Sequence, residues 1–175
     1  GVDDRAAAYQ AVSYLIQQGH RKIAVLGGPA TSYPSMMRRQ GAQQAMEDAG
    51  IRFEDKLYGL SNYDFESAYH AMNGLLARRA EFTALFAMSD VIAFGAIRAL
   101  VSAGLQVPED VSVIGFDGIT MSRYCVPVMT TIVQPSEQIA LQSIELLVRQ
   151  IEHGAPAQTV TLQPELQQGE SVRAI

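Results

Sequence analysis

The sequence predicts an α/β protein in which a doubly wound parallel sheet is covered by helices on both faces. Three observations predict this fold class. Amphipathic segments of helical spacing alternate with short apolar runs, the helical segments begin at Asp or Ser or end at Gly, and the run at residues 22–28 has the continuous apolar character of a strand buried on both faces. Strand, helix and strand in succession form right-handed crossovers, which make the strands parallel.

The first helix is predicted at residues 4–18. Asp3 and Asp4 mark its start, Gly19 marks its end, and its apolar residues follow the spacing of one helix face. These residues are Ala8, Ala11, Val12, Leu15 and Ile16. The first strand is expected directly afterwards, at residues 22–28.

Three further helices are predicted before residue 105. One ends at Gly50 after apolar residues at 42, 45, 46 and 49, one begins after Asp64, and one runs from Ser89 and Asp90 to Gly104. Because a carboxylate at a helix start accepts hydrogen bonds from free backbone N–H groups, we expect Asp90 to be a helix cap. Support of a binding site is the alternative role for this residue.

The other strands are predicted at residues 56–60, 83–88, 111–116 and 130–133. A longer helix is expected at residues 136–153, followed by short extended pieces at 159–162 and 165–167. Its apolar stripe consists of Ala140, Ile144, Leu147, Val148 and Ile151.

The composition excludes several function classes. The net charge is −5, with 13 Lys and Arg against 18 Asp and Glu, and the basic residues form no stripe for phosphate contacts. A single Cys leaves no internal disulfide and no Cys-based zinc site, so we expect no metal, no cofactor and a cytoplasmic location. No apolar run is long enough to span a membrane. The glycine-rich nucleotide-binding motifs and the Gly-x-Ser-x-Gly elbow are missing, which argues against an enzyme.

Polar side chains follow the predicted strands, where open α/β sheets bind their ligands. They supply a guanidinium fork, carboxylates, amides, a hydroxyl and an aromatic ring, which suit a neutral polyhydroxylated ligand. These residues are Arg38 and Arg39, beyond a loop containing Pro and Ser, then Asn62, Tyr63, Ser89, Asp90, Asp117 and Gln134.

Structural roles are the alternatives for several of these residues. Tyr63 could cover the sheet edge, and Arg38 and Asp117 could form a purely structural ion pair. We expect the three histidines, His20, His70 and His153, to lie on the solvated surface. Cys125 is expected to be a small buried hydrophobic residue.

Several motifs resemble the effector domain of the LacI/GalR family of transcription regulators and, more distantly, periplasmic sugar-binding proteins. Pro-Glu-Asp-Val-Ser-Val-Ile-Gly-Phe-Asp at 108–117 and Thr-Thr-Ile-Val-Gln-Pro at 130–135 are the most specific. The others are Val-Asp-Asp-Arg at 2–5, the segment 14–24, Arg-Arg-Gln-Gly at 38–41 and Ser-Asp-Val-Ile-Ala-Phe-Gly-Ala at 89–96.

The resemblance implies a type I periplasmic-binding-protein-like fold, with a flavodoxin-like subdomain whose strand order is second, first, third, fourth, fifth. It places residues 1–20 in the last helix of an N-terminal subdomain and 21–133 in the C-terminal subdomain. Residues 134–162 return to the N-terminal subdomain, and 163–175 pack on the C-terminal one. It also implies that the DNA-reading headpiece and the opening strands lie outside this sequence. The implied effector contacts are Arg38, Tyr63, Ser89, Asp117 and Gln134.

The expected function is therefore sensing of an effector, a carbohydrate, by a homodimeric regulator that binds operator DNA through an absent N-terminal helix-turn-helix. The alternative is a periplasmic sugar-binding receptor of a transport or sensing system, and a flavodoxin-like enzyme is the third class. With the opening strands missing, we expect the helices at 4–18 and 136–153 to pack on each other, on a neighbouring copy or in a swapped arrangement.

Overall fold

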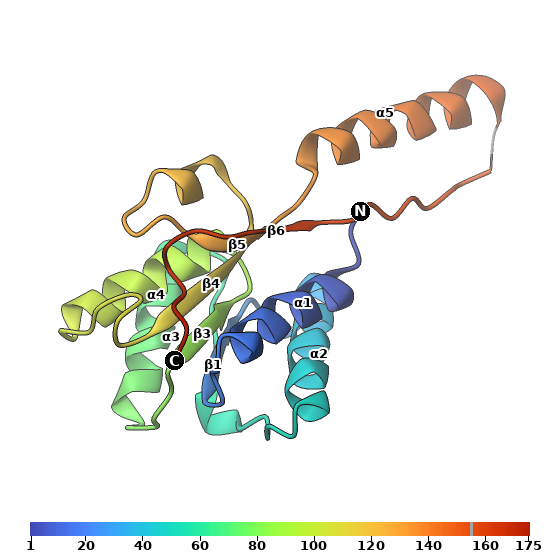
Figure 1. Ribbon diagram of the computed structural model, residues 1–175. Helices are drawn as coiled ribbons and strands as arrows, with labels where there is room; N and C mark the ends of the chain where they lie inside the picture. The colour runs from blue at the N-terminus through green and yellow to red at the C-terminus, as the bar shows by residue number, and fades with distance from the viewer. Residues whose placement is uncertain (155) are drawn as a thin grey trace.

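The computed structural model describes residues 1–154 and 156–175, and a six-stranded sheet forms its centre (Figure 1). The strands lie in the order β2-β1-β3-β4-β5-β6. The first five are parallel and β6 runs antiparallel to β5, so the predicted order of five strands is confirmed and one strand is added at the edge. Their bounds are β1 (Ile23–Gly27), β2 (Tyr58–Leu60), β3 (Ala84–Ala87), β4 (Ser112–Asp117), β5 (Thr130–Val133) and β6 (Glu165–Gln167).

Four of the five α-helices cover the sheet. Figure 1 shows α1 and α2 packed together on one face and α3 and α4 packed together on the other, which is the doubly wound arrangement. The helices are α1 (Asp4–Gln17), α2 (Tyr33–Asp48), α3 (Phe65–Ala77), α4 (Asp90–Ser102) and α5 (Ser136–His153).

The structure sets the start of α2 and shortens the second strand. Helix α2 begins at Tyr33, so Arg38 and Arg39 are helical and lie in its second turn, beyond the loop at residues 28–32 that contains Pro29 and Ser32. Pro34 lies in the first turn, where the missing N–H of proline costs nothing, and it therefore does not end the helix. Residues 55–57 form a 3-10 turn, which shortens the second strand to Tyr58–Leu60.

The core lies between the sheet and the four covering helices. Every residue of β1 is buried, as the continuous apolar run at 22–28 predicted, and every residue of β3 is buried as well. The largest fully buried side chains include Phe86, Phe116, Leu26 and Ile114, all from the sheet.

Helix α1 is part of this packed body. Its buried residues, Ala7, Ala8, Ala11, Val12 and Leu15, face α2 and the sheet. The expectation that its apolar stripe needs a cover from outside the chain, or from α5, is wrong. Helix α2, which follows β1, supplies most of that cover, and strands β3 and β5 of the sheet supply the rest.

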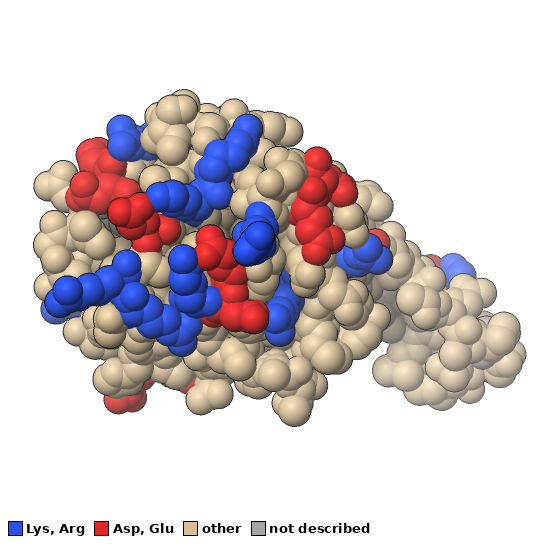
Figure 2. Space-filling view, turned by 90° about the horizontal axis from the view of Figure 1, so that it is seen from below, with Lys and Arg blue, Asp and Glu red and all other residues tan. Residues whose placement is uncertain are grey.

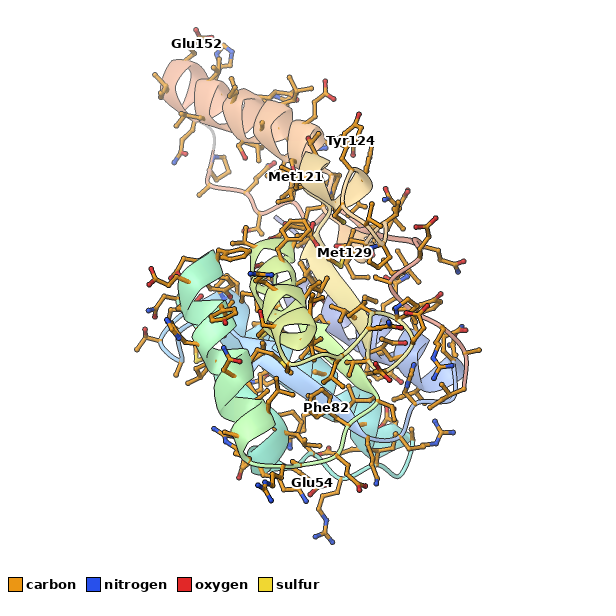
Figure 3. The ribbon with its side chains drawn as sticks, turned by 90° about the vertical axis from the view of Figure 1, so that its left-hand side faces the viewer. Glu54, Phe82, Met121, Tyr124, Met129 and Glu152 are labelled. Atoms are coloured by element: carbon orange, nitrogen blue, oxygen red, sulfur yellow. The ribbon has the colours of Figure 1, made fainter. Side chains whose placement is uncertain are left out.

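Helix α5 is different, because none of its residues is buried. It extends away from the sheet, with Glu152 near its far end (Figures 1 and 3). The segment that follows returns beside the N-terminus, where Val2 and Leu162 form a parallel bridge. The N-terminal ammonium of Gly1 also donates to the Val160 carbonyl at 2.9 Å, so the predicted extended piece 159–162 pairs with the start of the chain.

Charges of both signs are interspersed on the face shown in Figure 2. In the part of the chain that the structure describes, no helix is both long and apolar enough to cross a membrane.

Candidate ligand-binding site

The predicted site residues come from different elements that meet at the carboxyl edge of the parallel strands. Asp117 ends β4, Gln134 follows β5, and Ser89 and Asp90 follow β3. Arg38 lies in the second turn of α2, on the same side of the sheet. Surface hollows lie elsewhere, for instance between α4 and residues 126–127, so converging polar groups identify the site rather than an enclosed cavity.

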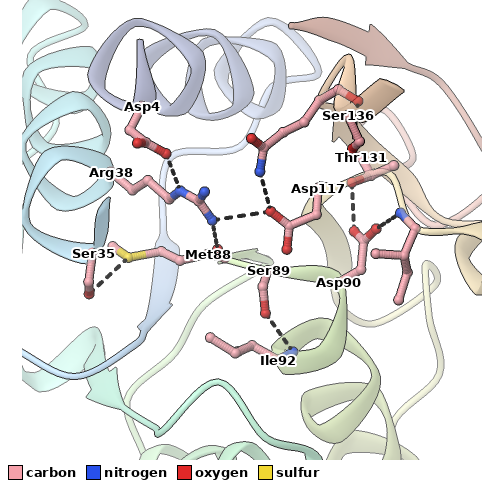
Figure 4. Close-up of polar contacts among 12 residues, drawn as sticks. Asp4, Ser35, Arg38, Met88, Ser89, Asp90, Ile92, Asp117, Thr131 and Ser136 are labelled. Carbon is pink, nitrogen blue, oxygen red and sulfur yellow. Dashed lines mark hydrogen bonds and ion pairs between the residues drawn. The ribbon is translucent and has the colours of Figure 1, made fainter. Parts of the chain in front are cut away.

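Arg38 is the centre of this cluster (Figure 4). Its Nε donates to Asp4 Oδ1 at 2.7 Å, and its Nη1 donates to the Met88 carbonyl and lies 3.5 Å from Asp117 Oδ1. The Phe116 ring lies below the guanidinium, with 3.6 Å from Cζ to the ring centroid. The ion pair between Arg38 and Asp117 is present, and these contacts hold the nearly buried guanidinium in one orientation.

Asp117 joins Arg38 to Gln134. The Gln134 side-chain amide donates to Asp117 Oδ1 at 2.7 Å, and its backbone N–H donates to the Asp117 carbonyl at 3.0 Å. Burial raises the pKa of Asp117, opposed by the Arg38 charge and the Gln134 hydrogen bond. Its φ of 111° is unusual for a residue with a side chain, and such strain is concentrated at binding sites.

The structure corrects the role expected for Asp90. Ser89 caps α4, since its side chain accepts from the Ile92 N–H at 3.1 Å. Asp90 is fully buried and accepts from the Thr131 hydroxyl at 2.6 Å and the Ile119 N–H at 2.8 Å. Its carboxylate points away from the helix backbone, into the space that the missing side chain of Gly115 leaves open, and it supports the turn after Asp117.

Burial also raises the pKa of Asp90 to about 6, against the two hydrogen bonds that favour its charged form. Desolvation is the larger effect because the carboxylate has no cation beside it among the described residues. Asp90 therefore does not cap the helix, and its alternative role, the support of a binding site, stays a prediction.

Tyr63 lies in the loop after β2 with a φ of 60°. Its ring covers Gly28, where a Cβ atom would come within 2.0 Å of the ring. The hydroxyl is buried and has no hydrogen-bond partner among the described residues. The ring thus covers Gly28 at the end of β1, which agrees with the structural alternative, and a contact between Tyr63 and an effector stays a prediction.

Two strand-end residues do not join the cluster. Arg39 stacks over Tyr58, with Cζ 4.4 Å from the ring centroid, and pairs with Asp55. Asn62 is exposed, and its backbone N–H donates to Ser67 Oγ.

Asp4 is the contributor that strand-end reasoning missed. Asp4 is the first residue of α1, and this helix precedes every strand. A search limited to the residues that follow strands therefore does not include it. The sequence signals for it were a second acidic residue beside a helix cap and its place in the Val-Asp-Asp-Arg motif at 2–5.

His20 corrects a further expectation. It is 1% exposed, and its ring bridges Thr83 Oγ1 at 2.9 Å and the Arg173 carbonyl at 3.1 Å. His70 and His153 are exposed, as predicted. Cys125 is only partly buried, and its thiol lies within hydrogen-bond distance of two backbone carbonyls, those of Ser122 and Pro127, either of which can accept its single proton.

The cluster is suited to binding through hydrogen bonds. It offers carboxylate and amide oxygens as acceptors and guanidinium and amide N–H groups as donors, next to an aromatic ring. Across residues 1–154 and 156–175, no group of three or more His, Cys, Asp or Glu residues is placed to hold a metal ion.

Comparison with known proteins identifies similar chains. Residues 12–172 match the model of the periplasmic binding protein-like domain family. The HTH-type transcriptional regulator MalR of Clostridium butyricum is 37% identical over 98% of this chain and 51% of its own length. The HTH-type transcriptional repressor CytR of Escherichia coli is 38% identical over 86% of this chain and 44% of its own length. The chain thus spans about half the length of these curated relatives.

Solved structures give the same result. The transcriptional regulator CelR in complex with cellobiose superposes with a TM-score of 0.93 and 33% identity, over 97% of this chain and 52% of CelR. A sugar-binding regulator of the LacI family from Escherichia coli, complexed with phosphate, superposes with a TM-score of 0.91 and 33% identity, over 99% of this chain and 63% of the regulator.

Proposed function

The chain belongs to the periplasmic binding protein-like family, together with the effector-binding regions of LacI-family regulators, and from this premise we propose that it senses the effector of such a regulator. A small molecule binds at the carboxyl edge of the sheet. Binding shifts the population of regulator dimers that can hold operator DNA. The DNA-reading helix-turn-helix belongs to the part of the regulator that this chain does not span.

The bonded trio of Arg38, Asp117 and Gln134 carries this proposal. These three side chains come from three separate elements and converge at the sheet edge where α/β proteins bind ligands. Tyr63 and Ser89 complete the proposed set of effector contacts. Tyr63 supports it with a partly exposed aromatic ring, because an aromatic face suits the apolar face of a sugar ring.

A carbohydrate is the proposed effector. The polar groups of the cluster pair well with hydroxyl groups, and one similar regulator, CelR, was solved with cellobiose. A periplasmic receptor would share the fold, but the relatives are HTH-type transcription regulators, which favours the regulator. The named relatives are regulators and not enzymes.

The proposed organisation places α5 and the segment up to residue 162 in a second subdomain. The extension of α5 away from the sheet, with no buried residue, supports this assignment. Residues 163–175 include β6 and pack on the sheet subdomain. The whole regulator is proposed to act as a homodimer in the cytoplasm.

Calorimetric titration of the protein with a panel of neutral mono- and disaccharides tests the proposal. Arg38→Ala and Asp117→Ala are each expected to weaken binding of the sugar found by about 1.5 to 3 kcal/mol, the range for hydrogen bonds to charged groups. Arg39→Ala is the matched control, because this neighbouring arginine pairs with Asp55 outside the cluster. Unchanged affinity in both cluster variants would remove the proposed site.

A further inference from the structure

Arg38 lies between two carboxylates. Asp4 is 2.7 Å from its Nε and Asp117 is 3.5 Å from its Nη1, and Figure 4 shows the guanidinium between them. The Asp4 and Asp117 side chains are 15% and 28% exposed, so solvent screens these charges only in part. Arg38 carries one positive charge and the two carboxylates carry two negative charges, so the group of Arg38, Asp4 and Asp117 is negative overall.

The hydrogen bonds of Arg38 also limit what it can bind. A guanidinium grips a phosphate or carboxylate with two parallel N–H groups, either Nε with Nη2 or Nη1 with Nη2. Asp4 occupies Nε, while the Met88 carbonyl and Asp117 occupy Nη1. Both forks have therefore lost one of their two donors, and Nη2 alone forms no hydrogen bond with the described residues.

Asp4 is the group that controls both effects. Unlike Asp117, it lies on α1 and forms no hydrogen bond with Gln134. Its removal would free the Nε donor, restore one complete fork and leave Arg38 balanced by Asp117 alone. An anion at the site would then meet one carboxylate instead of two.

We propose that Asp4 is a specificity-determining residue that makes this site accept uncharged polyhydroxylated ligands and reject their phosphorylated or carboxylated analogues. This inference rests on the proposed function for its neutral ligand. Asp4 acts through Arg38, by holding one of its donors and cancelling its charge.

Inorganic phosphate is the probe for the test, with binding to the protein measured by calorimetry and by phosphorus NMR. Asp4→Asn keeps the shape of the side chain and removes its charge, while its amide oxygen can still accept from Arg38 Nε. Asp4→Ala removes the charge and also frees the Nε donor, so the two variants separate the two effects. We expect Asp4→Asn to bind phosphate about tenfold or more tightly than the wild type, with the gain decreasing as salt rises. The gain should disappear in the double variant Asp4→Asn/Arg38→Gln.

Asp3→Asn is the matched control. It makes the same charge change one residue away, and asparagine caps a helix as well as aspartate, so α1 is retained. Equal phosphate affinity in the wild type and Asp4→Asn, or an equal gain in Asp3→Asn, would overturn the proposal. Circular dichroism monitors folding of each variant.

A measurement on the wild type keeps the proposal testable if Asp4→Asn does not fold. Each sugar that binds is compared with its phosphorylated form, and equal or tighter binding of a phosphorylated form would overturn the role of Asp4. Failure of every neutral sugar to bind would instead contradict the proposed function, while the phosphate comparison would still report on Asp4.

Discussion

A single residue, Asp90, is predicted to make the free energy of unfolding depend on pH. Burial raises its pKa in the folded protein from 3.8 to about 6, so the folded state holds the proton more tightly than the unfolded chain. The stabilising contribution is complete below pH 3.8 and is lost as the pH rises to about 6. The loss amounts to about 3 kcal/mol, from two pKa units of differential binding.

Asp90→Asn should remove this dependence. The amide oxygen can accept from the Ile119 N–H, and the amide nitrogen can donate to the Thr131 hydroxyl, so both contacts survive without a charge. Urea unfolding at pH 4.5 and pH 7 is expected to show the variant gaining about 2 kcal/mol relative to the wild type at the higher pH. A constant difference between the two proteins would contradict the buried charge.

His20 is predicted to respond in the opposite direction. Burial lowers its pKa from the ordinary value of 6.5, so below pH 6.5 the unfolded chain takes up a proton first and the folded state loses stability. His20→Gln should lose less stability than the wild type when unfolding at pH 5 is compared with unfolding at pH 7.5. The exposed His70→Gln is the control, and an identical pH profile for all three proteins would contradict the prediction.

Helices α1 and α5 have similar apolar stripes and opposite environments, which gives a prediction at the scale of the element. Leu15 is fully buried in α1, whereas Leu147 is 56% exposed on α5. Leu15→Ala should lower the free energy of unfolding by about 2 to 5 kcal/mol, because it leaves a cavity. Leu147→Ala should change it by less than about 0.5 kcal/mol in the isolated chain, since surface substitutions have small effects. Thermal or urea unfolding measures both, and a large loss for Leu147→Ala would mean that α5 is covered in solution.

The charge distribution gives a prediction for the whole molecule. The net charge is −5, and Lys and Arg are interspersed with Asp and Glu on the face shown in Figure 2. Affinity for duplex DNA depends on phosphate contacts with clustered cations. This chain by itself should therefore show no salt-dependent shift of operator-length duplexes in a gel mobility assay, with or without sugar. A shift that weakens with added salt would contradict the assignment of DNA binding to another part of the regulator.

The candidate site was partly predictable. Asp117 and Gln134 each follow a predicted strand, so the rule for α/β sheets located them before their contacts were known, and the structure joins them by a hydrogen bond. Their role in binding an effector stays a prediction. Asp90 was assigned to the wrong contact, because a helix start accommodates two polar residues and only the fold decides which of them is the cap. Ser89 became the cap, and Asp90 turned towards Thr131 on β5.

The sequence by itself determined the elements and their order, because caps and apolar periodicity act within one or two turns of the chain. Gly19 ends α1, Asp64 begins α3, and α5 has the predicted bounds Ser136–His153. Only the tertiary structure decided that His20 is buried, that α1 packs on α2 and that Asp4 pairs with Arg38, 34 residues away. The physical reason is that burial and charge pairing depend on which surfaces the crossovers bring together. The residues next to His20 or Asp4 in the sequence do not determine those long-range contacts.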